Sequence, residues 1–161
     1  MTLEEVVRSI TPADQNAAAQ AKARWDSIAK PLGSLGALES AIIRIAAITG
    51  SPNVDISKRA VVVMCADNGV VADGVTQTGQ EVTAIVAENM STGDTSVCAM
   101  GRAAGVEIVP VDIGVATPLH GERILQKNIR RGTANLSQGP AMTREEAERA
   151  ILVGVEVARD L

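Results

Sequence analysis

The pattern of apolar and polar positions changes abruptly near residue 55. Before it, apolar residues recur at helical spacing between short breaks, as in the predicted helix Ala37–Ile48. From Val61 to Cys65, five apolar residues follow one another without alternation, which is the pattern of a strand covered on both faces of a parallel sheet. The pattern therefore predicts an N-terminal helical subdomain over residues 1–55 and an α/β domain over residues 56–161.

Capping signals predict where several helices begin. A threonine followed three residues later by glutamate has capping-box spacing, and it occurs at Thr2–Glu5, Thr78–Glu81 and Thr143–Glu146. Thr11 before Pro12 indicates another start, with Thr11 as the N-cap of a helix that runs to about Ala29. We expect the box at Thr78 to begin a helix over residues 79–90, whose apolar face includes Val82 and Val86.

A second strand is predicted over Glu107–Asp112, after a further helix over residues 95–104. Pro110 cannot donate a ladder hydrogen bond, so it favours an edge strand or a bulge. A strand, two helices and a strand make a βαβ crossover, which implies a parallel pair. Two such strands are too few for a sheet covered on both faces, and the chain reads as the first part of a larger domain.

The predicted strands both end in an aspartate. Asp67-Asn68-Gly69 is a turn signal that follows the first strand, and Asp112 closes the second. Ligands of open α/β sheets bind at the carboxyl ends of the strands, so this edge is the candidate ligand site. The alternative is that each carboxylate only accepts hydrogen bonds from backbone N–H groups of its own turn.

Composition excludes several classes of protein. The net charge of −4 and the single aromatic residue, Trp25, argue against nucleic acid as a partner. No apolar run approaches the roughly 20 residues of a membrane span, and the acidic N-terminus is unlike a signal peptide, so we expect a cytoplasmic protein without a membrane partner. Cys65 and Cys98 lack metal-ligand spacing, and we expect two buried free thiols.

Phosphate-binding signals are weak. The chain has neither GxGxxG nor a P-loop. Arg130 and Arg131 are the best cationic pair for a phosphate, and Thr133 beside Gly132 is the best polar neighbour. A solvated surface pair is the alternative. The only histidine, His120, is expected to be an exposed loop residue without a nucleophile partner.

Three segments together resemble one enzyme family over essentially the whole chain. They are KPLGSLG from Lys30, CADNGVVADGVTQTGQEVTA from Cys65 and RRGTANLSQGPAMT from Arg130. The family is nicotinate-nucleotide:dimethylbenzimidazole phosphoribosyltransferase, which makes the lower-ligand nucleotide of cobalamin. The resemblance implies a Rossmann-like large domain, here incomplete, with a small helical domain and a homodimer. It also implies transfer of ribose phosphate from nicotinate mononucleotide to a benzimidazole-type base, with inversion and without a metal or other cofactor.

The resemblance also implies a base-binding site at Asp67, Asn68, Thr78 and Val86. Thr78 stands where the best-known members have serine, Val86 where they have glutamine, and Asn68 where many have histidine. A more apolar position 86 is compatible with other benzimidazoles, adenine or phenolic bases. We expect the family's general-base glutamate to lie beyond Leu161, so no catalytic residue is assigned within this chain.

The isolated chain is therefore expected to be inactive. It is interpreted either as the N-terminal part of the enzyme or as a half-subunit that another chain completes. In both interpretations an open sheet edge favours a homodimer or a strand-exchanged oligomer.

Overall fold

The computed structural model describes residues 1–161 and divides into two compact units. One unit comprises Glu4–Lys58, and the other comprises Arg59–Leu161 together with Met1–Leu3. The helices at the start of the chain are α1 (Leu3–Ser9), α2 (Gln15–Asp26) and α3 (Ala37–Thr49). No helix combines the length and the apolar character that crossing a membrane requires.

The helical unit is built on the packing of α2 against α3. Its buried apolar residues are alanines, which let the two helices approach closely: Ala17, Ala21, Ala46 and Ala47. The buried Glu39 carboxylate is compensated by Lys30, whose Nζ lies 2.8 Å from Glu39 Oε1. This contact, with the Leu35 N–H, holds the pKa of Glu39 below its usual value.

The start of α2 differs from the prediction. Its N-cap is Asp14, whose Oδ1 accepts hydrogen bonds from the N–H groups of Asn16 (2.8 Å) and Ala17 (3.0 Å). The predicted cap at Thr11 is therefore wrong, because the helix begins three residues later than predicted and Asp14 satisfies its first backbone donors. The helix also ends at Asp26, earlier than predicted.

The second unit is an α/β domain. Strands β1 (Ala60–Ala66), β2 (Glu107–Gly114) and β3 (Leu125–Gln126) form a parallel sheet in the order β1-β2-β3. The predicted α/β class and the parallel pair are confirmed.

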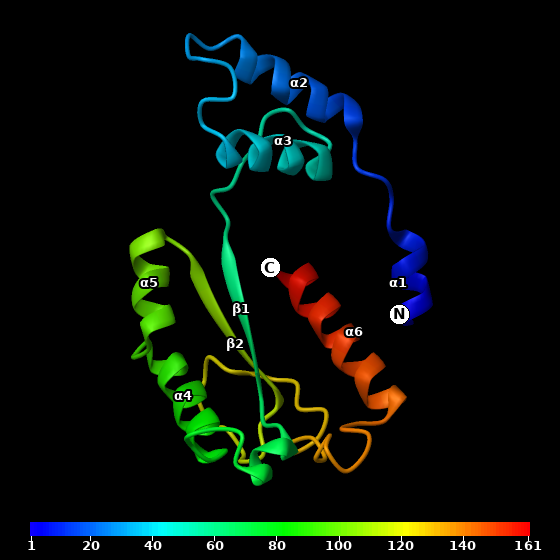
Figure 1. The fold of residues 1–161 in the computed structure, drawn as a ribbon, viewed down its shortest axis with the longest axis vertical. Helices are drawn as coiled ribbons and strands as arrows, with labels where there is room; N and C mark the ends of the chain where they lie inside the picture. The colour runs from blue at the N-terminus through cyan, green and yellow to red at the C-terminus, as the bar shows by residue number, and fades with distance from the viewer. The chain divides into compact units, whose positions relative to one another are not determined.

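Helices α4 (Glu81–Thr92) and α5 (Ser96–Ala104) cover one face of the sheet, and α6 (Arg144–Asp160) covers the other (Figure 1). Each face carries its own apolar core. The side beneath α4 and α5 includes Cys65, Ala87, Met90, Cys98, Ile108, Val115, Leu119 and Ile124. The side beneath α6 includes Val109, Val111 and Val157.

β2 is buried on both faces, whereas the helices on the two faces cover β1 only in part. Residues Ile108–Asp112 of β2 are all buried, whereas Val61 and Met64 of β1 are 42% and 40% exposed. β1 is an edge strand, and its apolar run reflects the helices on both faces and not a neighbour on each side. Pro110 accordingly lies in the middle strand and not at an edge. The β3 ladder begins at Val111, so β2 has no strand partner beside Pro110 on that side.

The start of α4 also differs from the prediction. The N-cap position is Gln80, which makes no side-chain capping bond, and the predicted box between Thr78 and Glu81 does not form. Thr76 Oγ1 instead donates to the carbonyl of Thr78 at 2.6 Å, which closes a local turn before the helix. The box between Thr143 and Glu146 does form and begins α6 as predicted. On the predicted apolar face of α4, Met90 is buried, but Val82, Ile85 and Val86 are exposed.

Two helical glycines allow a matched test of the packing. A Cβ at Gly101 of α5 would lie 2.8 Å from Ile108 Cδ1 and 3.0 Å from the carbonyl oxygen of Val106. Gly101→Ala should therefore lower the free energy of unfolding by about 1–3 kcal/mol, because the helix is forced away from β2. A Cβ at Gly154 of α6 would meet only Met64 Cε, at 3.6 Å. Gly154→Ala should raise stability by about 0.5–1 kcal/mol through helix propensity. Urea denaturation followed by circular dichroism measures both, and equal effects would contradict the packing described here.

Candidate functional site

A pocket of about 410 Å³ opens at the carboxyl end of β1. Its walls come from the end of β1, the 3₁₀ helix η1 (Gly69–Asp73), the connection to α4 and the first turns of α4. The sequence places them together because β1 turns directly into η1, and α4 then runs back beside the sheet. The four residues predicted for the base site all line this one pocket: Asp67, Asn68, Thr78 and Val86.

The pocket combines apolar walls with a polar rim. Met64 of β1 and Val82 of α4 are among its apolar lining residues, and Thr76 and Gln80 are polar ones. Gln80 Nε2 donates to the carbonyl of Asn68 at 3.0 Å, which fastens the connection before α4 to the end of β1. Apolar walls with a few placed hydrogen-bonding groups suit a flat heteroaromatic ligand.

Asp67 is both a structural residue and a lining residue. It is 3% exposed, and its Oδ2 accepts a hydrogen bond from the N–H of Ala116 at 2.8 Å. Its backbone N–H donates to the carbonyl of Gly114, and its carbonyl accepts from the N–H of Thr133, both at 3.0 Å. Oδ2 thus serves the fold, but its donor belongs to the turn after β2 and not, as the alternative predicts, to the turn of Asp67 itself. Oδ1 has no donor within the protein.

Asp112 is wholly buried and has no part in the pocket. Its Oδ1 accepts hydrogen bonds from the N–H of Val115 at 2.9 Å and from Asn128 Nδ2 at 2.7 Å. Its Oδ2 pairs with Arg131 Nη1 at 3.2 Å. The bond from Val115 is the one that the structural alternative predicts, and those from Asn128 and Arg131 fasten the segment after β3 to the end of β2, so the carboxylate has a structural role.

The residues predicted to bind phosphate make internal contacts. Arg130 Nη1 lies 3.2 Å from Glu146 Oε2, and Arg131 pairs with the buried Asp112. Thr133 Oγ1 accepts the N–H of Gly69 at 3.0 Å. None of the three predicted phosphate ligands lines the pocket. A phosphate at the arginines would compete with two carboxylates, and phosphate binding there stays a prediction.

The two cysteines are buried free thiols, as predicted. Cys65 also lines the pocket, between the sheet and α4. Burial raises the pKa of the Cys65 thiol, which keeps it protonated near neutral pH. We therefore assign Cys65 a packing role in the floor of the pocket and no nucleophilic one.

Sequence reasoning missed several lining residues. Thr76 and Gln80 lie within the resembling segment that begins at Cys65, but the pattern assigns Gln80 only to a helix. Met64 belongs to the apolar run that the pattern predicts to be wholly buried. The signal that could have found them is proximity in sequence to Asn68 and Thr78, on a connection that must turn back over the strand end.

The helical unit has a hollow of its own, of about 510 Å³, lined mainly by apolar residues such as Trp25, Ile28 and Ile42. It contains no carboxylate, and its polar side chains Arg24 and Asn53 are bonded to each other at 3.1 Å. The strand-end pocket carries more hydrogen-bonding chemistry, and it is the candidate site.

A parallel sheet with helices on both faces and a pocket at the carboxyl end of a strand defines an α/β domain of the type that binds nucleotides and their bases. Comparison with known proteins gives the family. The chain belongs to the phosphoribosyltransferase family, whose model matches residues 10–161.

Relatives and solved structures agree with this assignment and with the resemblance found in the sequence. A nicotinate-nucleotide–dimethylbenzimidazole phosphoribosyltransferase from Clostridium tetani is 42% identical over 155 residues, covering 96% of this chain and 43% of the relative. One from Acetivibrio thermocellus is 46% identical over 138 residues, covering 86% of this chain and 39% of the relative. The crystal structure of CobT from Thermus thermophilus matches with a TM-score of 0.83 at 43% identity, covering 90% of this chain and 44% of that one. The chain thus spans less than half the length of these relatives.

The contact between Arg130 and Glu146 leads to a prediction about how the free energy of unfolding changes at acid pH. Glu146 Oε2 accepts the N–H of Thr143 at 2.8 Å, and this bond, with the charge of Arg130, holds the pKa of Glu146 below its usual value. A carboxyl whose pKa is lowered on folding contributes stability above its unfolded pKa, about 4.3, and loses that contribution as the pH falls through the folded value.

Glu146→Gln should therefore lower stability at pH 7 and flatten its decline below about pH 4.3. Glu145→Gln is the matched control, because Glu145 is an exposed carboxylate in the same helical turn without a hydrogen bond or ion pair. Thermal unfolding measured from pH 7 to pH 3 compares the three proteins. Parallel curves for Glu146→Gln and the wild type would contradict the assigned role.

Proposed function

We propose that this chain is the base-binding part of an enzyme that transfers ribose phosphate from nicotinate mononucleotide to 5,6-dimethylbenzimidazole or a related base. The products are α-ribazole 5′-phosphate and nicotinate. One observation carries the proposal: the four positions that the resemblance assigns to the base all line one pocket at a strand end. The names of the relatives supply the reaction, and the family supplies its class.

In this proposal the pocket holds the base by its flat faces. Val82 and Val86 of α4 and Val63 of β1 provide apolar contact, so the uncharged aromatic base gains free energy by leaving water for the pocket. Asn68 and Thr78 offer hydrogen-bonding groups at the rim, and Oδ1 of Asp67 offers an acceptor. These groups orient the ring so that one nitrogen faces the ribose carbon C1′.

Binding of the heteroaromatic base is not sufficient for the chemical step. The attacking nitrogen must lose a proton, and positive charge develops on the ribose as nicotinate leaves. No carboxylate of this chain is assigned as the general base, which we expect on polypeptide beyond Leu161. Without it the chain orients one substrate and does not complete the reaction. No metal or other cofactor is part of the proposal.

A second candidate is a base-binding half-subunit that another chain completes. The open side of β1 favours it, because this edge strand pairs with β2 only. Exposed apolar residues on the same unit also favour association, and Met64, Val82 and Ile85 are at least 36% exposed. We accordingly propose a homodimer or a strand-exchanged oligomer. We propose a cytoplasmic location on the basis of the two free thiols.

The catalytic proposal is tested by supplying the part of the enzyme that is expected to carry the general base. The purified chain is mixed with the part of the Clostridium tetani relative that lies beyond the match, and α-ribazole phosphate is measured by mass spectrometry. We expect no product from either polypeptide alone and product from the mixture. A panel of benzimidazoles, adenine and phenols then tests the base site, where strict selectivity for dimethylbenzimidazole would refute a loosened pocket at Val86.

Thr78→Ala tests the rim in the same mixture. We expect a higher KM for the base, because the variant removes a hydrogen-bonding group that lines the pocket. Thr117→Ala is the control, because Thr117 is exposed, lies outside the pocket and makes no hydrogen bond through its side chain. A mixture that assembles and makes no product from any base would contradict the catalytic proposal.

Association is tested on the chain alone. Size-exclusion chromatography with light scattering should give a mass of at least twice 16.7 kDa. The side chains on the open edge and on α4 lose contact with water in such an assembly, which is the physical reason for it. Ile85→Lys should shift the distribution toward monomer, since Ile85 is 56% exposed and a lysine there opposes burial. A wild-type monomer over the whole concentration range would contradict this prediction.

A further inference from the structure

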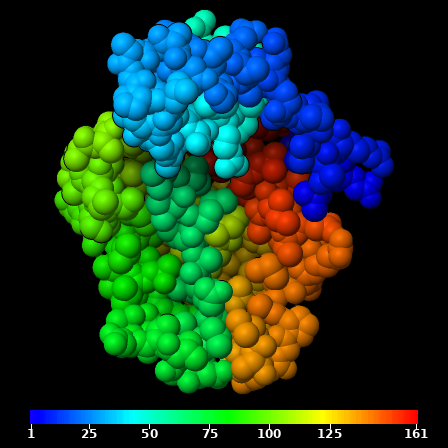
Figure 2. Space-filling model, turned by 45° about the horizontal axis from the view of Figure 1, so that its top comes forward, coloured from blue at the N-terminus to red at the C-terminus, as the bar shows by residue number.

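The segment that follows β1 and the segment around residue 135 meet along one seam. Figure 2 shows the green residues after β1 and the orange residues that precede α6 in contact at the bottom of the view. At this seam Asn135 Nδ2 donates to Asp73 Oδ1 at 2.8 Å, and Ser137 Oγ donates to Asp73 Oδ2 at 2.6 Å. We name Asp73, Asn135 and Ser137 the clamp.

We propose that Asp73 is a positioning residue: the clamp holds η1 in place as a preformed wall of the base pocket. The proposal rests on the proposed base-binding function and deepens it. Asp73 is the last residue of η1, whereas Asn68 and Val71, at the other end and in the middle of the same segment, line the pocket. Asp73 itself does not line the pocket, so it acts on the base only through the wall.

The first residue of η1 is fixed by the same loop. The N–H of Gly69 donates to Thr133 Oγ1 at 3.0 Å. A Cβ at Gly69 would lie 2.6 Å from the carbonyl oxygen of Thr133 and 2.6 Å from the carbonyl carbon of Ala134, so the two backbones are in direct contact. η1 is therefore fastened at both ends to one loop, and Asp73 supplies the fastening at its far end.

The donors of the clamp are themselves held in place. The N–H of Ala134 donates to the carbonyl of Ala141 at 2.8 Å, which ties the loop to the residues before α6. Asn135 Oδ1 accepts the N–H of Ser137 at 2.9 Å, so the side chain that binds Asp73 also closes the turn beside it. The two donors are thus oriented before Asp73 meets them, and they need little reorganisation to bind both carboxylate oxygens.

Asp73 is exposed, so the clamp contributes little to global stability. Its effect is on which positions η1 occupies. When the binding-competent position is only partly populated, the apparent Kd rises by the inverse of its population. We expect Asp73→Ala to raise the apparent Kd for the base about tenfold, which corresponds to a competent wall in about a tenth of the molecules.

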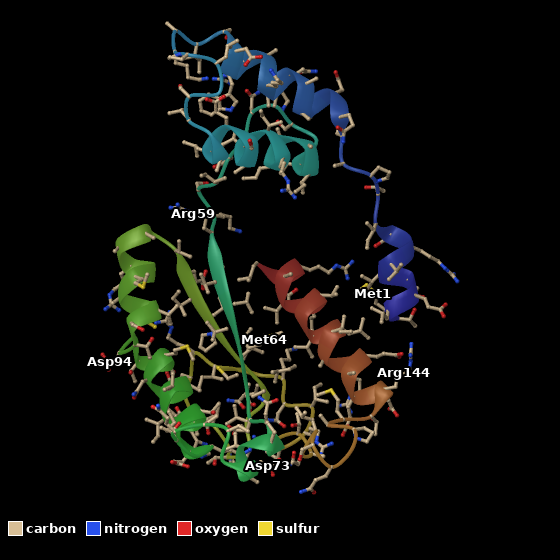
Figure 3. All side chains as sticks on the ribbon, in the orientation of Figure 1. Met1, Arg59, Met64, Asp73, Asp94 and Arg144 are labelled. Atoms are coloured by element: carbon tan, nitrogen blue, oxygen red, sulfur yellow. The ribbon has the colours of Figure 1, made fainter.

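The experiment uses two readouts on the chain. Hydrogen exchange of the peptide that covers residues 69–74 reports on η1, whose N–H groups at Val71 and Gly74 are hydrogen-bonded within the segment. Isothermal titration with 5,6-dimethylbenzimidazole reports on the pocket. Asp94→Ala is the matched control, because Asp94 is an exposed aspartate that accepts a hydrogen bond from Thr92, yet it lies at the junction of α4 and α5 (Figure 3).

A pair of substitutions separates geometry from charge. Asn135→Asp places two carboxylates against each other and should open the clamp. The double variant Asp73→Asn with Asn135→Asp exchanges donor and acceptor. The new amide at position 73 donates to position 135, and it still accepts from Ser137. The N–H of Ser137 keeps its acceptor as well. We expect this variant to recover slow exchange and tight binding, which a loss caused by misfolding would not do.

The outcomes distinguish a failure of the clamp proposal from a failure of the proposed base-binding function. Faster exchange over residues 69–74 with a raised Kd in Asp73→Ala and Asn135→Asp, both reversed in the double variant, supports the clamp. Unchanged exchange in Asp73→Ala overturns it, whatever happens to binding. Faster exchange with an unchanged Kd overturns the positioning role. No binding of the base by the wild-type chain overturns the base-binding function itself, and with it the role of the wall.

Discussion

Asp67 makes three hydrogen bonds, two through its backbone and one through its side chain, that fasten the end of β1, where the pocket opens, to more distant parts of the α/β domain. Its N–H binds the end of β2 at Gly114, its Oδ2 binds the turn after β2 at Ala116, and its carbonyl binds the distant loop at Thr133. Segments separated by about fifty residues or more in sequence converge on one buried residue at the end of β1. The pocket exists because the chain turns at this point instead of extending the strand.

The sheet is covered best over its middle strand, and its edges are β1 and the two-residue β3. β2 is buried by helices on both faces and has strand neighbours on both sides, but β1 has a neighbour on one side only. The apolar side chains that α4 leaves exposed, including Val82 and Val86, lie around the pocket. The same surface that could accept a flat base is therefore adjacent to the surface that favours association, and both uses depend on removing these side chains from water.

Local sequence signals predict which helices and strands form better than they predict how deeply those elements are buried. Ala37–Thr49 and the capping box at Thr143 agree with the structure, because spacing and caps are properties of adjacent residues. The apolar run overstates the burial of β1, since it records helices on two faces and carries no sign of a missing neighbouring strand. The two-residue strand β3 has no periodicity to detect. The clamp is invisible in the sequence for another reason: Asp73 meets Asn135 across 62 residues, and only the fold brings them together.

The lining residues divide by how much of the fold depends on them. Asp67 lines the pocket and Gly69, which does not, begins the adjacent η1; both are held by long-range hydrogen bonds or close backbone contacts, so changing them alters the shape of the pocket. Thr78 and Val86 line the same pocket through side chains that make no hydrogen bond within the protein. A substitution at Thr78 or Val86 changes what the pocket contacts and leaves its framework in place.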